Sequence, residues 1–154
     1  MPNYQLVLAS TSPYRKQLLN KLAIEFETAT PDFDETPLEN EAPIELVRRL
    51  AKGKAESCSV SQPSLVIGSD QVCVINGNII GKPHTREKAI EQLLAQSGQS
   101  IQFYTGLALH NTHTALTDIK VDTFTVHFRA LSKKQIDNYV EKEQPFYCAG
   151  SFKS

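Results

Sequence analysis

Apolar positions along the chain alternate between the spacing of strands and the spacing of helices. Continuous or alternating apolar residues predict strands at 4–9, 24–28, 65–67, 72–75, 79–80, about 100–109 and about 115–129. Apolar residues at intervals of three or four predict helices after Pro13 and Pro43, and again after Thr85 and Ser132. Strands and helices alternate in the first half, whereas strands are adjacent in the second. This order favours an α/β fold with a mixed sheet.

Residues that favour helix starts and turns lie at the boundaries of these predicted elements. Ser10 or Thr11 is expected to cap the first helix, in whose first turn Pro13 costs no hydrogen bond. Thr85 is expected to cap the third helix, which Gly98 ends, and the pair Ser132 and Gln135 forms a capping box for the fourth. Between two apolar runs, the pair at 76–77 reads Asn-Gly, a strong signal for a two-residue hairpin turn.

Two of the predicted helices carry an apolar face. On the first helix that face is expected to contain Leu18, Leu19 and Leu22. On the second it is expected to contain Ile44, Val47, Leu50, Ala51, Ala55 and Cys58. The segment 29–41 between these helices holds two prolines and five carboxylates, which predicts a polar loop.

Length and composition narrow the class of protein. A chain of 154 residues with 40% hydrophobic and 21% charged residues predicts one globular domain over 1–154. The net charge of −1 argues against a non-specific nucleic-acid binder, and no apolar run is long enough to predict a membrane span. Three cysteines make no disulfide framework, and the N-terminus has no secretory signal, so a reducing cytoplasmic setting is expected.

The first candidate site is the junction between a strand and a helix at 10–15, which reads Ser-Thr-Ser-Pro-Tyr-Arg. Free N–H groups at a helix start, hydroxyls and the guanidinium of Arg15 together make a phosphate cradle. The alternative is a plain capped helix with a surface arginine.

The second candidate is the segment 68–71, Gly-Ser-Asp-Gln, which follows an apolar strand. A carboxylate at a strand end, beside a glycine that permits close approach, suits a metal ligand or a general base. An aspartate in an ordinary turn is an equally good interpretation of Asp70.

Lysines and further carboxylates complete the candidates. Lys52, Lys54 and Lys82 carry point charges that can neutralise a polyphosphate, although a solvated helix face is favoured for at least one of the first two. Asp34 and Glu35 could complete a magnesium site with Asp70, or could simply face solvent in a polar loop. The phosphate-loop and dinucleotide-binding glycine motifs are both absent from the sequence.

The segment 8–15 resembles the opening motif of the Maf family, the septum-formation-like nucleotide pyrophosphatases. Further segments resemble the motifs of that family in the same order: 34–35, 50–55, 68–72, 81–83, 104–106, 131–139 and 149–152. The resemblance implies a nucleoside triphosphate pyrophosphohydrolase that cleaves between the α and β phosphates. It also implies the Maf/inosine-triphosphatase-like α/β fold, with a long mixed β-sheet flanked by helices and a cleft between two lobes.

The resemblance also implies roles for the matching residues. Asp70 is expected to activate water or to bind metal beside it, and Glu35 to help hold Mg²⁺ or Mn²⁺. Contacts to the triphosphate are expected from Ser10, Ser12, Arg15, Lys54 and Lys82. Tyr14 and Gln71 stand where the branch of the family acting on dTTP and UTP has Arg and Thr. They therefore resemble the branch acting on 7-methyl-GTP, whose cationic base an aromatic ring could stack upon.

Family members continue past the segment that matches 149–152, so the resemblance implies a chain that lacks its C-terminal part. This leaves two hypotheses, a metal-dependent pyrophosphatase that removes modified nucleotides, and a non-catalytic nucleotide-binding or cell-division regulatory protein. The expected partner is a nucleoside triphosphate, without nucleic acid or membrane. The sequence leaves the oligomeric state open, with a homodimer as one option.

Overall fold

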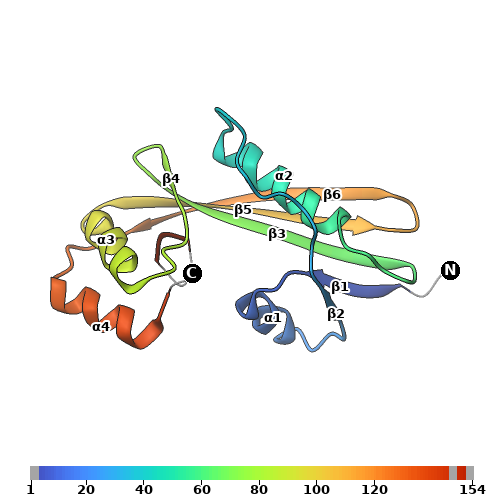
Figure 1. Ribbon diagram of the computed structural model, residues 1–154, viewed down its shortest axis with the longest axis horizontal. Helices are drawn as coiled ribbons and strands as arrows, with labels where there is room; N and C mark the ends of the chain where they lie inside the picture. The colour runs from blue at the N-terminus through green and yellow to red at the C-terminus, as the bar shows by residue number, and fades with distance from the viewer. Residues whose placement is uncertain (1–3, 146–148, 152–154) are drawn as a thin grey trace. The chain divides into compact units, whose positions relative to one another are not determined.

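The computed structural model describes residues 4–145 and 149–151. The elements follow in the order β1 (Gln5–Ala9), α1 (Pro13–Asn20), β2 (Glu27–Ala29), α2 (Pro43–Glu56), β3 (Ser64–Ile75), β4 (Asn78–Ile80), α3 (Arg86–Gln96), β5 (Ser100–Asn111), β6 (Leu116–His127), α4 (Lys133–Glu143) and the 3₁₀ turn η1 (Ala149–Ser151) (Figure 1).

Six strands of the described chain form one mixed sheet in the order β2-β1-β3-β5-β6, with β4 paired to β3. β1 is parallel to both of its neighbours, with Leu8 opposite Thr28 of β2 and Ile67 of β3. β4 is antiparallel to β3. β5 and β6 are neighbours joined only by residues 112–115, a connection too short for parallel strands. The predicted mixed sheet flanked by helices is confirmed.

The chain divides into two compact units. One contains Met1–Asp70 and Thr105–Asp122, and the other contains Gln71–Tyr104 and Thr123–Ser154. The long strands β3, β5 and β6 each contribute residues to both units. The single domain expected over 1–154 therefore stays a prediction.

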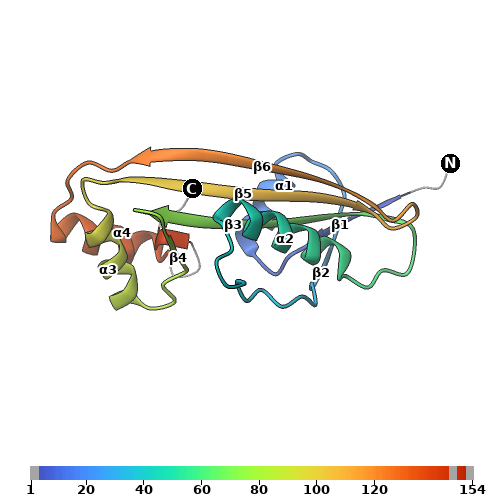
Figure 2. The same cartoon turned by 90° about the horizontal axis from the view of Figure 1, so that it is seen from above.

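In the first unit, α2 packs closely on β3 and β5 (Figure 2). A Cβ atom placed on Gly68 would lie 2.2 Å from the carbonyl oxygen of Ala51, and one on Gly106 would lie 2.3 Å from that of Val47. Only glycine at these strand positions lets the helix backbone come so near. The buried core beneath contains Val7, Ala9, Ala51, Ala55, Val66 and Ala108.

The second unit has its own apolar clusters. α3 and α4 pack together through Ala89, Leu93, Ile136 and Val140. A second cluster joins Cys73 and Ile75 of β3 to Ile101 and Phe103 of β5. The Phe103 ring stacks on that of Phe124 of β6, with 5.0 Å between the centroids.

Several local predictions are confirmed. The Thr85 hydroxyl accepts a hydrogen bond from the Lys88 N–H, and the capping box of Ser132 and Gln135 is formed in both directions. Asn76 and Gly77 have φ values of 50° and 80°, as a tight two-residue hairpin turn with two left-handed residues requires.

Other local predictions are wrong. β3 does not end at 68–70 but continues to Ile75, because Gly68 serves the close approach of α2 instead of a turn. The first helix is capped by Ser12, neither Ser10 nor Thr11. Leu18 and Leu22 are 59% and 62% exposed, so its predicted apolar face is largely uncovered in the described structure.

Three further predictions need correction or fall partly outside the described residues. The second strand is only Glu27–Ala29 and not 24–28, and Ile44 is exposed at the start of α2. The residues of the segment 146–152 predict the start of another element, and of these residues the structure describes 149–151 as a 3₁₀ turn. The rest of that segment lies outside the described residues.

Candidate functional site

Lys54 is the centre of a polar cluster in the first unit. It follows Leu50 by four residues and Ala51 by three, so it lies on the buried face of α2, and its side chain is only 8% exposed. Its ammonium lies 3.0 Å from Asp70 Oδ1 and 2.7 Å from Glu35 Oε1. A longer hydrogen bond of 3.4 Å goes to the Ser69 carbonyl oxygen. Of the two neighbouring lysines, Lys52 is therefore the solvated one.

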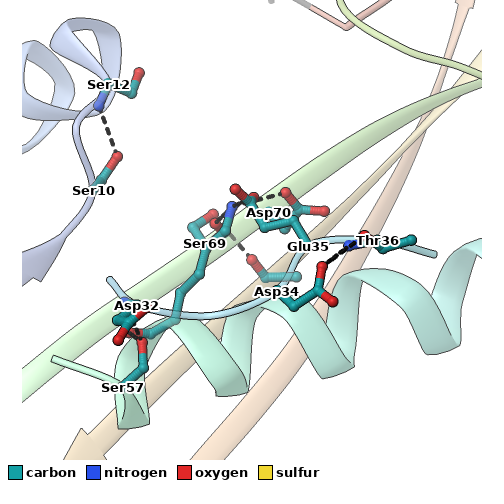
Figure 3. A network of polar contacts seen from close by, with 11 residues as sticks. Ser10, Ser12, Asp32, Asp34, Glu35, Thr36, Ser57, Ser69 and Asp70 are labelled. Carbon is teal, nitrogen blue, oxygen red and sulfur yellow. Dashed lines mark hydrogen bonds and ion pairs between the residues drawn. The ribbon is translucent and has the colours of Figure 1, made fainter. Parts of the chain in front are cut away.

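Asp70 lies in the middle of β3, with its side chain 13% exposed. The preceding residue holds the strand against β5, because the Ser69 hydroxyl donates a 3.0 Å hydrogen bond to the Gly106 carbonyl oxygen. Figure 3 shows Glu35, on the loop before α2, beside Asp70. Two carboxylates from segments far apart in sequence thus converge on one ammonium group.

Arg15 belongs to the same electrostatic cluster. Burial lowers the pKa of its guanidinium, whereas the negative charges of Asp70 and Glu35 act to raise it. The guanidinium is therefore near enough to both carboxylates for their charges to act on it. Arg15, Lys54, Asp70 and Glu35 together place two positive and two negative charges in one partly buried region.

In this structure, polar groups of the expected phosphate cradle at 10–15 form hydrogen bonds with one another. The Ser12 hydroxyl accepts a 3.4 Å hydrogen bond from the Arg15 N–H, and the Ser12 N–H donates to Ser10 Oγ at 3.0 Å (Figure 3). Leu8 of β1 pairs with Ile67 of β3. Ser10 lies two residues after Leu8, and Ser69, the residue before Asp70, lies two residues after Ile67. This register brings the junction and the carboxylate to the same part of the sheet.

The two acidic residues of the polar loop have different environments. Asp34 accepts hydrogen bonds from the Thr36 hydroxyl and N–H at 2.6 and 3.0 Å, and these bonds lower the pKa of its carboxyl group. Glu35 is the residue that reaches Lys54. Of the three carboxylates considered for a metal site, Glu35 and Asp70 thus share Lys54 as a partner, whereas Asp34 is bound by Thr36.

The pair formed by Glu35 and Asp70 fits a magnesium site only when other ligands complete it. Among the described residues, no group of three or more His, Cys, Asp or Glu side chains is arranged to hold a metal ion. Mg²⁺ typically uses one or two carboxylates together with substrate phosphates and water. Two carboxylates that already converge on one cation position match that requirement.

Three further predicted residues are Lys82, Gln71 and Tyr14. Lys82 is exposed and follows Gly81 in the second unit, to which Gln71 also belongs. The Tyr14 side chain lies outside the described part of the chain. The expected roles of these three residues remain predictions.

The sequence did not indicate which residues hold the polar loop. The main ones are Arg49 of α2 and Ser57, the C-cap residue of that helix. Arg49 is not part of the predicted apolar face, and it forms a salt bridge to Glu41 with 2.7 Å between Nε and Oε2. The available signal was the four-residue spacing of Arg49, Gly53 and Ser57, which places all three on one stripe of a helix.

None of the helices in the described residues is both long enough and apolar enough to span a membrane. This finding concerns the helices alone.

Comparison with known proteins shows the family. Residues 5–154 match the family model described as Maf-like protein. The chain is 70% identical to a 7-methyl-GTP pyrophosphatase of Vibrio vulnificus, over the whole chain and 79% of the relative. It is 66% identical to proteins of the same name from Vibrio parahaemolyticus and Vibrio cholerae, again over the whole chain and 80% of each relative.

Among solved structures, the chain resembles the Ham1 protein of Staphylococcus aureus. The TM-score is 0.50 at 18% identity, covering 80% of this chain and 71% of the other, which supports a common fold. That likeness concerns the fold alone, whereas the match to the family model over residues 5–154 shows that this chain belongs to the Maf family.

Proposed function

We propose that this chain is a nucleoside triphosphate pyrophosphatase. It hydrolyses the α–β phosphate bond of 7-methyl-GTP to 7-methyl-GMP and diphosphate, and so removes a modified nucleotide in the cytoplasm. Membership of the Maf family and the names of relatives at 66–70% identity support this proposal. The observation that carries it is the convergence of Asp70 and Glu35 on the buried ammonium of Lys54.

Asp70 is proposed as the general base that orients water and accepts its proton as the water oxygen attacks phosphorus. Its low exposure and fixed place within β3 favour this role, because a general base must be held within hydrogen-bond distance of the proton that it removes. The proton goes to the carboxylate, the P–O bond to the β phosphate breaks, and diphosphate leaves with the bond's electron pair.

Positive groups offset the charge of the triphosphate. Arg15 and Lys54 lie in one cluster with Asp70, so phosphate oxygens bound there meet a guanidinium and an ammonium. Ser10 and Ser12 are proposed to turn their hydroxyl and N–H groups toward phosphate, in exchange for the internal hydrogen bonds that they now make. Lys82 is proposed as a further phosphate contact.

Glu35 and Asp70 would hold a divalent cation, Mg²⁺ or Mn²⁺, together with phosphate oxygens. Such a cation supplies Lewis-acid polarisation of the phosphoryl oxygens and neutralises charge on the leaving group. Tyr14 and Gln71 are proposed to select the base, with the Tyr14 ring stacked on the cationic methylated purine.

The test is hydrolysis of a panel of nucleotides, measured by diphosphate release with Mg²⁺ or Mn²⁺ present. Asp70→Asn is expected to lower kcat by about 100-fold or more, since a carboxamide cannot accept the proton. The matched control is Asp118→Asn, an exposed carboxylate on β6, which is expected to leave kcat unchanged.

Full activity of Asp70→Asn would show that another group is the base. Tight nucleotide binding by the unmodified chain without diphosphate release would instead favour the non-catalytic alternative.

A further inference from the structure

One stripe of α2 holds the polar loop that carries Glu35. The stripe consists of Arg49, Gly53 and Ser57, which follow one another at intervals of four residues and therefore lie above one another on the helix. The loop, residues 30–42, contains neither helix nor strand, so its own backbone does not fix its path. Its position depends on what it contacts.

The part of the loop before Glu35 is held by two contacts. The Asp32 N–H donates a 3.0 Å hydrogen bond to the Ser57 hydroxyl (Figure 3). The Phe33 ring occupies the space that Gly53 leaves open, since a Cβ atom on Gly53 would lie 2.3 Å from Cζ of that ring. Both contacts depend on the residues of this stripe, because one needs the Ser57 hydroxyl and the other needs the space that Gly53 leaves.

The part after Glu35 is held by one guanidinium. Arg49 donates to both carboxylate oxygens of Glu41, at 2.7 and 3.0 Å, and to the Thr36 carbonyl oxygen at 3.0 Å. Glu41 also accepts a 3.0 Å hydrogen bond from the Leu38 N–H, and its side chain is 8% exposed. One planar group thus links both ends of the segment 36–41 to α2.

Glu35 lies between these two sets of contacts. Within the described part of the chain, its carboxylate forms an ion pair with Lys54 alone, and its side chain is 59% exposed. A single ion pair to a largely exposed side chain gives little positional restraint. The flanking contacts are therefore what set the distance between Glu35 and Asp70.

We propose that Arg49 and Gly53 are positioning residues that hold Glu35 beside Lys54 and Asp70, and that they thereby set the affinity of this site for a divalent cation. The inference rests on the proposed function in giving Glu35 a role in cation binding. Neither residue contacts the substrate in this account, because both act through the loop.

Two substitutions test the inference without removing the helix. Arg49→Lys keeps the charge but loses the planar fork, so it cannot bind Glu41 and Thr36 together. Gly53→Ala favours the helix itself, yet its methyl group displaces the Phe33 ring. The matched control is Arg48→Lys, an exposed neighbour that makes no ion pair within the described residues.

The first measurement is Mn²⁺ binding to the nucleotide-free protein, followed by water proton relaxation. Both variants are expected to bind Mn²⁺ about tenfold more weakly, as is typical when residues supporting a metal ligand are lost, while the control changes less than about twofold. In a Glu35→Gln background, Arg49→Lys is expected to have no further effect, because both changes remove the same ligand.

The second measurement is amide hydrogen exchange of residues 32–41. Faster exchange is expected in Arg49→Lys and Gly53→Ala, with unchanged exchange in the core strand β3. In hydrolysis, the cation concentration at half-maximal rate is expected to rise more than kcat falls.

Three results would overturn the inference: unchanged Mn²⁺ affinity in both variants, additive effects with Glu35→Gln, or slow exchange of the loop despite the substitutions. Failure of the proposed function is distinguishable, because an unmodified chain without hydrolytic activity still gives a Mn²⁺ affinity and an exchange rate to compare with those of the variants.

Discussion

The loop 30–42 and the segment 81–85 both lack helix and strand, and each carries a residue with a proposed role in substrate binding, Glu35 and Lys82. Charged groups hold the first. Arg49 of α2 contacts Glu41 and the Thr36 carbonyl oxygen. The start of the second segment is also held from a helix, but by a neutral side chain.

Neutral amide and backbone groups hold Gly81, at the start of the segment 81–85. Gln92 of α3 donates to the Gly81 carbonyl oxygen at 3.0 Å and accepts from the Ser151 hydroxyl at 2.5 Å. The Gly150 N–H donates to the same Gly81 oxygen, and buried Gln96 donates to the Gly150 carbonyl oxygen at 2.6 Å. This amide network links α3, the segment 81–85 and the 3₁₀ turn without using a charge.

The two kinds of contact should respond differently to pH and to salt. A salt bridge weakens when its carboxylate is protonated or when salt screens it, whereas neutral hydrogen bonds do not titrate. The amide network depends instead on close packing, since Gly150 sits directly on the Cys73 side chain. Changes of packing should therefore affect the amide network most, and changes of pH the contacts between Arg49 and Glu41.

The largest effect is expected from Gly150→Ala. Its φ of +66° disfavours any side chain, and a Cβ atom there would lie 2.6 Å from Cys73 Sγ, so the amide network must shift. We expect a loss of about 3 kcal/mol in the free energy of unfolding, measured by urea titration and circular dichroism.

The matched control is Gly98→Ala, with a similar φ of +71° and no atom within 4 Å of the added Cβ. It should lower the free energy of unfolding by only about 1 kcal/mol, because only the backbone conformation disfavours the side chain. Equal losses in the two variants would show that packing on Cys73 contributes nothing to the second loop.

A smaller effect is expected from Gln92→Ala, which removes the donor to Gly81 and the acceptor for Ser151. The free energy of unfolding should fall by about 1–2 kcal/mol, and this loss should be the same at pH 4 and pH 7, since a neutral network does not titrate. Glu91→Ala, an exposed neighbour on α3, is the control. A strong dependence of the Gln92→Ala loss on pH would break the comparison.

The smallest effect is expected from Glu41→Gln, and it should depend on pH. The hydrogen bond from Arg49 lowers the pKa of the Glu41 carboxyl below its ordinary value of 4.5. The salt bridge between Arg49 and Glu41 therefore stabilises the folded state fully when the pH is above the ordinary pKa of the carboxyl group. This contribution is lost as the pH falls through the lowered pKa.

The difference in unfolding free energy between the unmodified chain and Glu41→Gln should be about 0.5–1 kcal/mol at pH 7 and should shrink toward zero at acidic pH. Urea titrations at a series of pH values measure it. A difference that stays constant down to pH 3 would show that Arg49 holds the loop without the help of the carboxylate charge.

Some parts of the fold were predictable because they depend on near neighbours. The cap of α3 at Thr85, the capping box of α4 and the turn at Asn76 and Gly77 each use groups within three residues. Prediction failed where packing between segments far apart in sequence determines the local structure. Gly68 was interpreted as the end of a strand, but it is the point at which α2 meets β3.

The candidate site shows the same division. Residue type and order were enough to select Asp70, Glu35, Arg15 and Lys54 through the resemblance to the Maf family. They did not reveal that Lys54 is the buried member of the lysine pair, although its place three residues after Ala51 was a usable signal. The resemblance selected Glu35 and not Asp34, and the structure shows that the Asp34 carboxylate is bound by Thr36.

Local order and motifs along the chain were enough to predict the caps of α3 and α4, the hairpin turn, the mixed α/β class and the family. Only the tertiary structure decided which charges meet. Lys54, Asp70 and Glu35 come from α2, β3 and a loop, and they converge because glycines in β3 and β5 admit the helix and because Arg49 fastens the loop to it. Such distances arise from packing between segments far apart in sequence, which no local pattern records.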